Sequence, residues 1–138
     1  MELFIEFLGR EWALVGSLMI LIALMIFNDS RRSGTMVSPQ IASGIVNKQD
    51  GVFIDVREAK DFRAGHVAGS INIPFSKFKD SLSELEKYRG KPIVLICKYG
   101  QTTGSAGKML VTAGFPEVYR MTGGLTEWEN SRFPTVKK

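Results

Sequence analysis

Few residues of this chain could perform chemistry, and the most informative is its single cysteine, Cys97. It follows the apolar run 92–96 and precedes a short polar segment and then a helical pattern over 103–113. In α/β folds, ligands bind beyond the carboxyl ends of the strands. Loop N–H groups and the dipole at a helix N-terminus stabilise a thiolate, the nucleophilic form of cysteine. The position therefore indicates a nucleophile, with a buried, inert cysteine as the alternative.

The same inventory excludes two common classes of small protein. One cysteine cannot form a disulfide within the chain, and with His66 as the only histidine the usual zinc ligands are too few. We therefore expect neither a metal nor a cofactor. The 138 residues carry 18 Lys and Arg against 14 Asp and Glu, a net charge of +4. Because this excess is mild and no basic run exceeds two residues, we expect no nucleic-acid partner.

Strand and helix patterns alternate along the part of the chain that must position Cys97. Short apolar runs predict strands over 52–56, 70–73, 92–96 and 118–121. Helical patterns begin at Ser38-Pro39 and recur over 58–63, 81–88, 103–113 and 125–130. The alternation predicts an α/β domain with a mainly parallel central sheet flanked by helices. The run 92–96 is too apolar for an edge strand, so it should lie inside this sheet.

A long apolar segment precedes this domain. Residues 12–28 carry no charge, and as a helix they would span roughly 25 Å, slightly less than a hydrocarbon core of roughly 30 Å. A cleaved signal peptide is one alternative, but the first eleven residues contain three glutamates, and no small-residue cleavage site follows Phe27. A buried core helix would have to be apolar on all faces. We therefore expect a transmembrane helix over 12–28 that contacts the lipid bilayer and that residues 3–8 could extend.

The expected organisation is a transmembrane anchor over 1–28, a polar linker over 29–36 and one domain over 37–138. Arg31 and Arg32 directly follow the apolar span, whereas only Arg10 and the amino terminus precede it. The positive-inside rule therefore predicts that the domain faces the cytoplasm. A reducing cytoplasm also suits a lone reactive thiol.

Three blocks of the sequence resemble, in the right order, the signatures of rhodanese-like domains. Residues 55–57 (Asp-Val-Arg), 61–62 (Asp-Phe) and 65–74 (Gly-His-Val-Ala-Gly-Ser-Ile-Asn-Ile-Pro) resemble the N-terminal signature. Residues 97–102 resemble the active-site loop, and residues 123–128 with Phe133-Pro134 resemble the C-terminal signature. The resemblance extends over residues 36–136, and the preceding span is similar to that of small membrane-anchored bacterial rhodaneses. It implies a single-pass protein of the bacterial inner membrane.

The resemblance implies a sulfurtransferase with Cys97 as the catalytic nucleophile. This cysteine would take the sulfane sulfur of thiosulfate or a related donor, become a persulfide, and pass the sulfur to a thiol or to cyanide. The implied substrate-binding residues are those that follow Cys97: Lys98, Tyr99, Gly100, Gln101, Thr102 and Thr103. The resemblance makes Asp55 and Arg57 supports of this loop, with a simple strand-end ion pair as the alternative. It favours a structural role for His66.

Two other functions are open to this scaffold. A phosphatase of the type with Cys, five residues and Arg needs a guanidinium to bind the phosphoryl dianion. The sixth residue after Cys97 is Thr103, and the loop contains no arginine, which argues against phosphatase chemistry. The second alternative is a non-catalytic interaction module that recruits a membrane-protein partner. The retained cysteine favours the enzyme.

Overall fold

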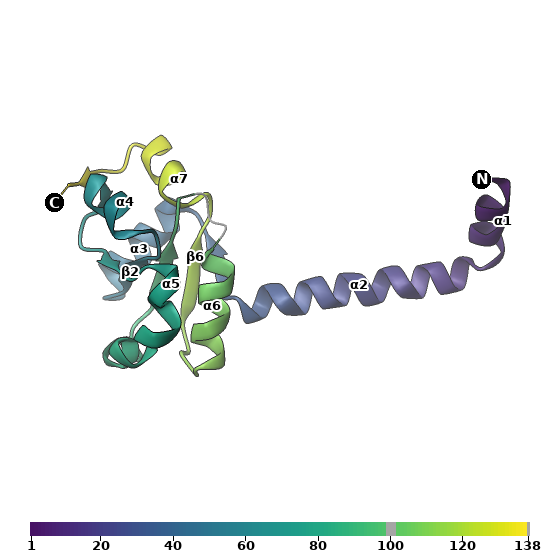
Figure 1. The fold of residues 1–138 in the computed structure, drawn as a ribbon, viewed down its shortest axis with the longest axis horizontal. Helices are drawn as coiled ribbons and strands as arrows, with labels where there is room; N and C mark the ends of the chain where they lie inside the picture. Colours follow the sequence, from purple (N-terminus) through teal and green to yellow (C-terminus); the bar gives the residue numbers. More distant parts are fainter. Residues whose placement is uncertain (99–101, 138) are drawn as a thin grey trace. The chain divides into compact units, whose positions relative to one another are not determined.

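A computed structural model describes residues 1–98 and 102–137 of the chain (Figure 1). The chain divides into two compact units, Met1–Arg31 and Arg32–Lys138. The first unit is helical, whereas the second contains every strand that the described residues form. The candidate site lies in the second unit.

Two helices, α1 (Glu2–Arg10) and α2 (Trp12–Arg32), begin the chain. The backbone leaves helical geometry at Glu11 (φ −108°, ψ 33°), so residues 3–8 form a helix of their own and do not lengthen α2. The segment Trp12–Asp29 is long and apolar enough to cross a membrane, and none of it is buried inside the protein. By length and composition, α2 is therefore a helix that could span a membrane.

Most of the segment that we expected as a linker, 29–36, belongs to the helix before it and the strand after it. Helix α2 continues to Arg32, and β1 (Thr35–Val37) begins after Ser33 and Gly34. Ser33 is buried, and a side chain on Gly107 would overlap the Ser33 carbonyl oxygen. The short connection therefore packs closely against the helix that carries Gly107.

A parallel sheet forms the centre of the second unit. It comprises β1, β2 (Val52–Asp55), β4 (Ile71–Asn72), β5 (Ile93–Ile96) and β6 (Val118–Met121). The strand order is β1-β6-β5-β2-β4, and each pairing within it is parallel. The predicted interior strand is confirmed: β5 is third in this order, and all four of its residues are buried. An all-apolar strand suits this place because helices cover the sheet on both faces.

The helices confirm the predicted α/β class. They are α3 (Pro39–Lys48), α4 (Ala59–Ala64), α5 (Phe75–Phe78), α6 (Thr103–Thr112) and α7 (Gly124–Asn130), with a 3-10 helix, η1 (Lys79–Tyr88). The predicted start of α3 is confirmed, since the Ser38 hydroxyl accepts a hydrogen bond from the Ile41 backbone N–H at 3.3 Å. The helix predicted over 81–88 is a 3-10 helix that begins two residues earlier.

Side chains of β5 alternate between two apolar cores, one on each face of the sheet. Ile93 and Leu95 belong to the core that contains residues of α5, η1 and α6. Val94 and Ile96 belong to the core that contains residues of α3 and α7. Successive side chains of a strand point to opposite faces. Cys97 continues the alternation and joins the α6 core, which sets the side of the sheet on which its thiol lies.

A small antiparallel sheet closes the C-terminal end of the domain. Strand β3 (His66–Val67) pairs with β7 (Thr135–Val136), and neither strand was predicted from the sequence. Between α7 and β7, the Trp128 indole N–H donates to the Pro134 carbonyl oxygen at 3.0 Å. Trp128 is 4% exposed and packs in the α3–α7 core.

Candidate active site

Cys97 lies one residue beyond β5, at the carboxyl end of the central strand. Its side chain is 5% exposed and lies in the wall of a hollow of about 350 Å³. We call this space the cysteine hollow; its lining is Val56, Arg57, Glu58, Asp61, Phe75, Ser76, Cys97, Lys98 and Thr102. Cys97 thus borders a recess large enough for a small molecule, although the domain shields the residue from most of the solvent.

The predicted substrate-binding loop contributes to this hollow at both of its ends. Lys98 and Thr102 line the hollow, whereas Thr103 is fully buried as the first residue of α6. Tyr99, Gly100 and Gln101 lie outside the described residues. Because α6 begins directly after Thr102, its N-terminus borders the hollow. The unpaired N–H groups and the dipole of a helix N-terminus stabilise negative charge there.

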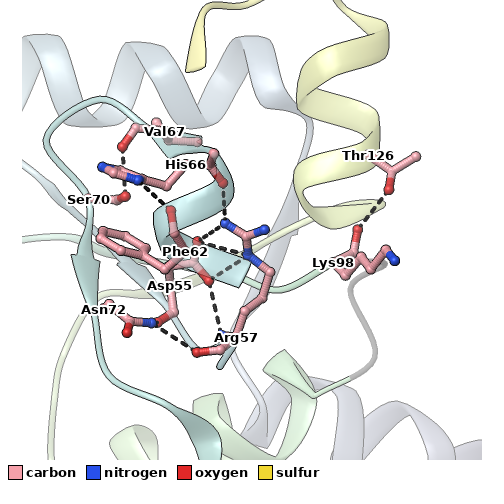
Figure 2. Close-up of polar contacts among 10 residues, drawn as sticks. Asp55, Arg57, Phe62, His66, Val67, Ser70, Asn72, Lys98 and Thr126 are labelled. Atoms are coloured by element: carbon pink, nitrogen blue, oxygen red, sulfur yellow. Dashed lines mark hydrogen bonds and ion pairs between the residues drawn. The ribbon is translucent and has the colours of Figure 1, made fainter. Parts of the chain in front are cut away.

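The start of α7 is hydrogen-bonded to the backbone that carries Cys97. The Leu125 N–H donates to the Cys97 carbonyl oxygen at 2.7 Å. The Thr126 N–H donates to the Lys98 carbonyl oxygen at 3.2 Å. The Thr126 hydroxyl donates to the same oxygen at 3.0 Å (Figure 2). The first N–H groups of a helix have no hydrogen-bond partners within that helix. These contacts therefore give partners both to the first N–H groups of α7 and to the carbonyl oxygens of Cys97 and Lys98. Gly124 permits the approach: its φ is 60°, and any side chain there would overlap the Cys97 carbonyl.

A buried ion pair joins the end of β2 to the turn that follows it. The Asp55 carboxylate is fully buried and accepts hydrogen bonds from Arg57 Nε at 3.0 Å, Nη2 at 2.7 Å and the Arg57 backbone N–H at 3.0 Å (Figure 2). Arg57 Nη2 also donates to the carbonyl oxygen of Gly65, directly after α4, at 2.7 Å. Such contacts are those expected of a residue pair that supports the site. The supporting role of Asp55 and Arg57 itself stays a prediction.

Asn72 extends this network, although the sequence did not single it out. At the end of β4, its Nδ2 donates to the carbonyl oxygens of Asp55 at 3.1 Å and Arg57 at 2.9 Å (Figure 2). It thereby fixes the turn that carries the ion pair. The available signal was its place within the 65–74 block, one residue before the end of the predicted strand 70–73.

His66 has a structural environment. It is 4% exposed, and its Nδ1 lies 2.7 Å from the Phe62 carbonyl oxygen (Figure 2). Because a carbonyl oxygen only accepts hydrogen bonds, Nδ1 carries the proton. The imidazole also stacks on the Phe62 ring, with 3.7 Å between the centroids. Among the described residues His66 does not line the cysteine hollow, so these contacts fasten α4 to β3.

Charges of both signs surround the cysteine hollow. Lys98 supplies a positive charge on the loop side, whereas Glu58 and Asp61 supply negative charges at the start of α4. The guanidinium of Arg57 also lines the hollow, but its charge is balanced by Asp55. Within residues 1–98 and 102–137, no group of three or more His, Cys, Asp and Glu side chains could hold a metal ion.

Comparison with known proteins gives consistent matches over this domain. The model of the rhodanese-like domain family matches residues 38–131. GlpE of Pseudoalteromonas translucida, a thiosulfate sulfurtransferase, is 34% identical over 94 residues, which are 68% of this chain and 88% of GlpE. The crystal structure of a rhodanese-related protein from Thermoplasma volcanium superposes with a TM-score of 0.66 at 28% identity, covering 75% of this chain and 99% of that one.

One relative extends the similarity to the N-terminal helices. YibN, an uncharacterised protein of Escherichia coli (strain K12), is 30% identical over 141 residues, which are 99% of this chain and 99% of YibN. The similarity to YibN therefore extends over the N-terminal helices as well as the domain.

We expect Asp55→Ala to lower the free energy of unfolding by about 3–5 kcal/mol, because Arg57 would keep a nearly buried charge without its carboxylate. Chemical denaturation of the full-length chain in detergent would measure this. The matched control is Glu86→Gln, which removes a carboxylate from the exposed Glu86–Arg89 pair and should change stability far less. Equal losses in the two variants would contradict the supporting role of Asp55.

Gly124→Ala should lower the free energy of unfolding by about 1–3 kcal/mol, because the new methyl group meets the Cys97 carbonyl at a backbone geometry that favours glycine. Gly44→Ala is the control: it lies inside α3 with no atom within 4 Å of the added carbon, so it should stabilise by about 0.5–1 kcal/mol. Thermal unfolding of both variants compares them. A Gly124→Ala protein as stable as wild type would refute the close contact.

Proposed function

Because the chain belongs to the rhodanese-like domain family, we propose that it is a sulfurtransferase that carries sulfane sulfur as a persulfide on Cys97. The donor is thiosulfate or a related compound, and the acceptor is a thiol or cyanide. The observation that carries the proposal is the place of the only cysteine, in a hollow at the end of the central strand and beside the N-terminus of α6. The similarity to GlpE, a thiosulfate sulfurtransferase, supports the same class of reaction.

In the first half-reaction, the Cys97 thiolate attacks the outer sulfur of thiosulfate. A new sulfur–sulfur bond forms on Cys97, the sulfur–sulfur bond of thiosulfate breaks, and sulfite leaves with the electron pair of that bond. The step needs the thiolate but no general base once the thiolate has formed. The N-terminus of α6 stabilises the negative charge at the nucleophile and at the bound anion.

In the second half-reaction, an acceptor anion attacks the outer sulfur of the persulfide. The bond between the two sulfur atoms breaks, the Cys97 thiolate is regenerated, and the acceptor leaves as thiocyanate or as a persulfide. The chain contains no second cysteine, so no resolving thiol is available within one molecule. The acceptor is therefore an external molecule.

The donor would be held by the loop, from Lys98 to Thr103. Lys98 and Thr102 line the hollow, and the proposal assigns an ammonium and a hydroxyl of these residues to the donor. The predicted roles of Tyr99, Gly100 and Gln101 belong to the same proposal. Arg57 also lines the hollow, but Asp55 and the Gly65 carbonyl oxygen already engage its Nη2, so we assign it a positioning role. Asp55 and Arg57 would act as positioning residues for the loop.

We further propose that α2 anchors the domain in the bacterial inner membrane, with the domain in the cytoplasm. Large apolar side chains of Trp12–Asp29 are exposed, as a lipid-facing helix requires. Arg31 and Arg32 at its C-terminal end favour a cytoplasmic domain. The alternative function, an interaction module that recruits a membrane-protein partner, would use the same anchor without sulfur transfer.

Incubation with thiosulfate should add about 32 Da, the mass of one sulfur atom, to the wild-type chain, and a thiol reductant should remove it. Cys97→Ser should show neither this mass nor thiocyanate formation, because no other thiol can take the sulfur. Intact-protein mass spectrometry and a thiocyanate assay would measure both.

The Cys97→Ser variant should unfold at nearly the same denaturant concentration as wild type, since one atom changes beside a loop. Retained thiocyanate formation by Cys97→Ser would remove Cys97 from the reaction. If the wild-type chain takes sulfur from no donor, the interaction module becomes the better account.

A reporter that is active only outside the cytoplasm should give no signal when it is fused after residue 138, whereas a cytoplasmic reporter should give one. Replacing Arg31 and Arg32 together with glutamate removes the charge bias, so part of the population should then invert. A strong external signal from the wild-type fusion would overturn the orientation.

A further inference from the structure

Helix α1 has no part in the functions described so far, and its side chains separate by type around its axis. The charged residues Glu2, Glu6 and Arg10 follow one another at intervals of four, which places them in one stripe along the helix. At 3.6 residues per turn, the large apolar side chains fall in one continuous arc of about 200°. We call this surface the apolar arc; it consists of Leu3, Phe4, Ile5, Phe7 and Leu8.

The apolar arc is not covered by the protein. None of the residues of α1 is buried, and at the centre of the arc Phe4 is 63% exposed. A continuous set of exposed apolar side chains marks a surface that binds another apolar surface. The charged stripe, however, excludes burial of the whole helix in hydrocarbon, where charges are costly. The sequence of α1 therefore suits surroundings that are apolar on one side and aqueous on the other.

A break in the backbone separates α1 from α2. The Glu11 N–H donates to the Phe7 carbonyl oxygen at 2.9 Å and so ends α1. The Glu11 carbonyl oxygen accepts from the N–H groups of Leu14 at 2.9 Å and Val15 at 3.1 Å, and so begins the hydrogen bonding of α2. Because Glu11 itself has non-helical backbone angles, α1 can take a direction different from that of α2.

Trp12 marks the level at which α2 would leave a bilayer. It is the first residue of the apolar segment Trp12–Asp29, and its side chain is 74% exposed. Tryptophan is enriched at the boundary between membrane and water. With α2 in a bilayer, Trp12 therefore lies at this boundary, and α1, which ends two residues earlier, reaches the same depth.

We propose that α1 lies along the surface of the lipid bilayer, with its apolar arc among the outer acyl chains and its charged stripe toward water. This inference rests on the proposed membrane anchor α2 and does not depend on sulfur transfer. The stripe contains two carboxylates and one guanidinium, so attraction to anionic headgroups does not hold the helix. The apolar arc holds it, as in other helices that lie in the membrane interface.

Spin labels at single positions of the full-length chain test this placement. Cys97→Ser removes the native thiol, and one label at a time is attached after Phe4→Cys, Glu6→Cys or Ile20→Cys. The protein is reconstituted in phosphatidylcholine vesicles. Collisions of the label with oxygen, which concentrates in hydrocarbon, and with a water-soluble nickel complex then report its depth. Phe4 samples the apolar arc, Glu6 the charged stripe and Ile20 the middle of α2.

The label at Phe4 should lie roughly 5–10 Å inside the boundary between headgroups and acyl chains. The label at Glu6 should be reached by the nickel complex. Replacing part of the phosphatidylcholine with the anionic phosphatidylglycerol should leave both depths unchanged, because the stripe is not basic.

A matched pair of substitutions tests whether the apolar arc holds the helix. Phe7→Glu places a carboxylate in the arc and should move the label at Phe4 into water. Gly9→Glu adds the same charge beside the stripe, where an added carbon meets no atom within 4 Å, and should leave that label in place. Equal effects of the two substitutions would contradict the proposal.

Equal depths of the labels at Phe4 and Glu6 would overturn the inference. So would a label at Phe4 that is shielded from both reagents and magnetically coupled to the label of a second molecule, since the arc would then cover another copy of α1. The label at Ile20 separates this failure from that of the anchor. If Ile20 lies in hydrocarbon while Phe4 lies in water, the anchor stands and the inference falls. If the nickel complex reaches Ile20, the anchor itself fails, and the inference with it.

Discussion

The buried ion pair between Asp55 and Arg57 is the interaction that holds the end of β2, the turn after it and the end of α4 together. A buried charge without a partner is strongly unfavourable, so the guanidinium is held wherever the carboxylate of β2 places it. Because Arg57 also binds the Gly65 carbonyl oxygen, the pair fixes the end of α4 against the sheet. It also balances the charge of a guanidinium that borders the cysteine hollow.

The second constraint comes from the far end of the sequence. The carbonyl oxygens of Cys97 and Lys98 find their partners in the first turn of α7, more than twenty residues later. Two consecutive glycines, Gly123 and Gly124, allow the two backbones to meet. The loop that carries the cysteine is thus held by a contact that forms only once β6 and α7 are in place. The site therefore needs the whole domain, because the partners described for these two carbonyl oxygens lie in α7, outside β5.

The parts of this structure that follow from local patterns could be predicted from sequence. The apolar run that became β5, the cap at Ser38 and the place of Cys97 at a strand end all rest on neighbouring residues. Strand β1 could not be found in this way, because its three residues are mostly exposed and become a strand by pairing with β6. Strands β3 and β7 likewise form only by pairing with each other, although both residues of β3 are buried. Asp61 stood out only as part of the N-terminal signature, and Glu129 not at all; only the fold brings these two surface carboxylates to one hollow.

The two-residue connection between α2 and β1 has a consequence for encounter rates. Ser33 and Gly34 span about 7 Å when fully extended, and Ser33 is buried. If α2 anchors the chain in a bilayer, as we propose, the domain stays attached to that membrane. Partners embedded in the same membrane would then meet it at a high effective concentration, whereas a dissolved molecule would meet it at its bulk concentration.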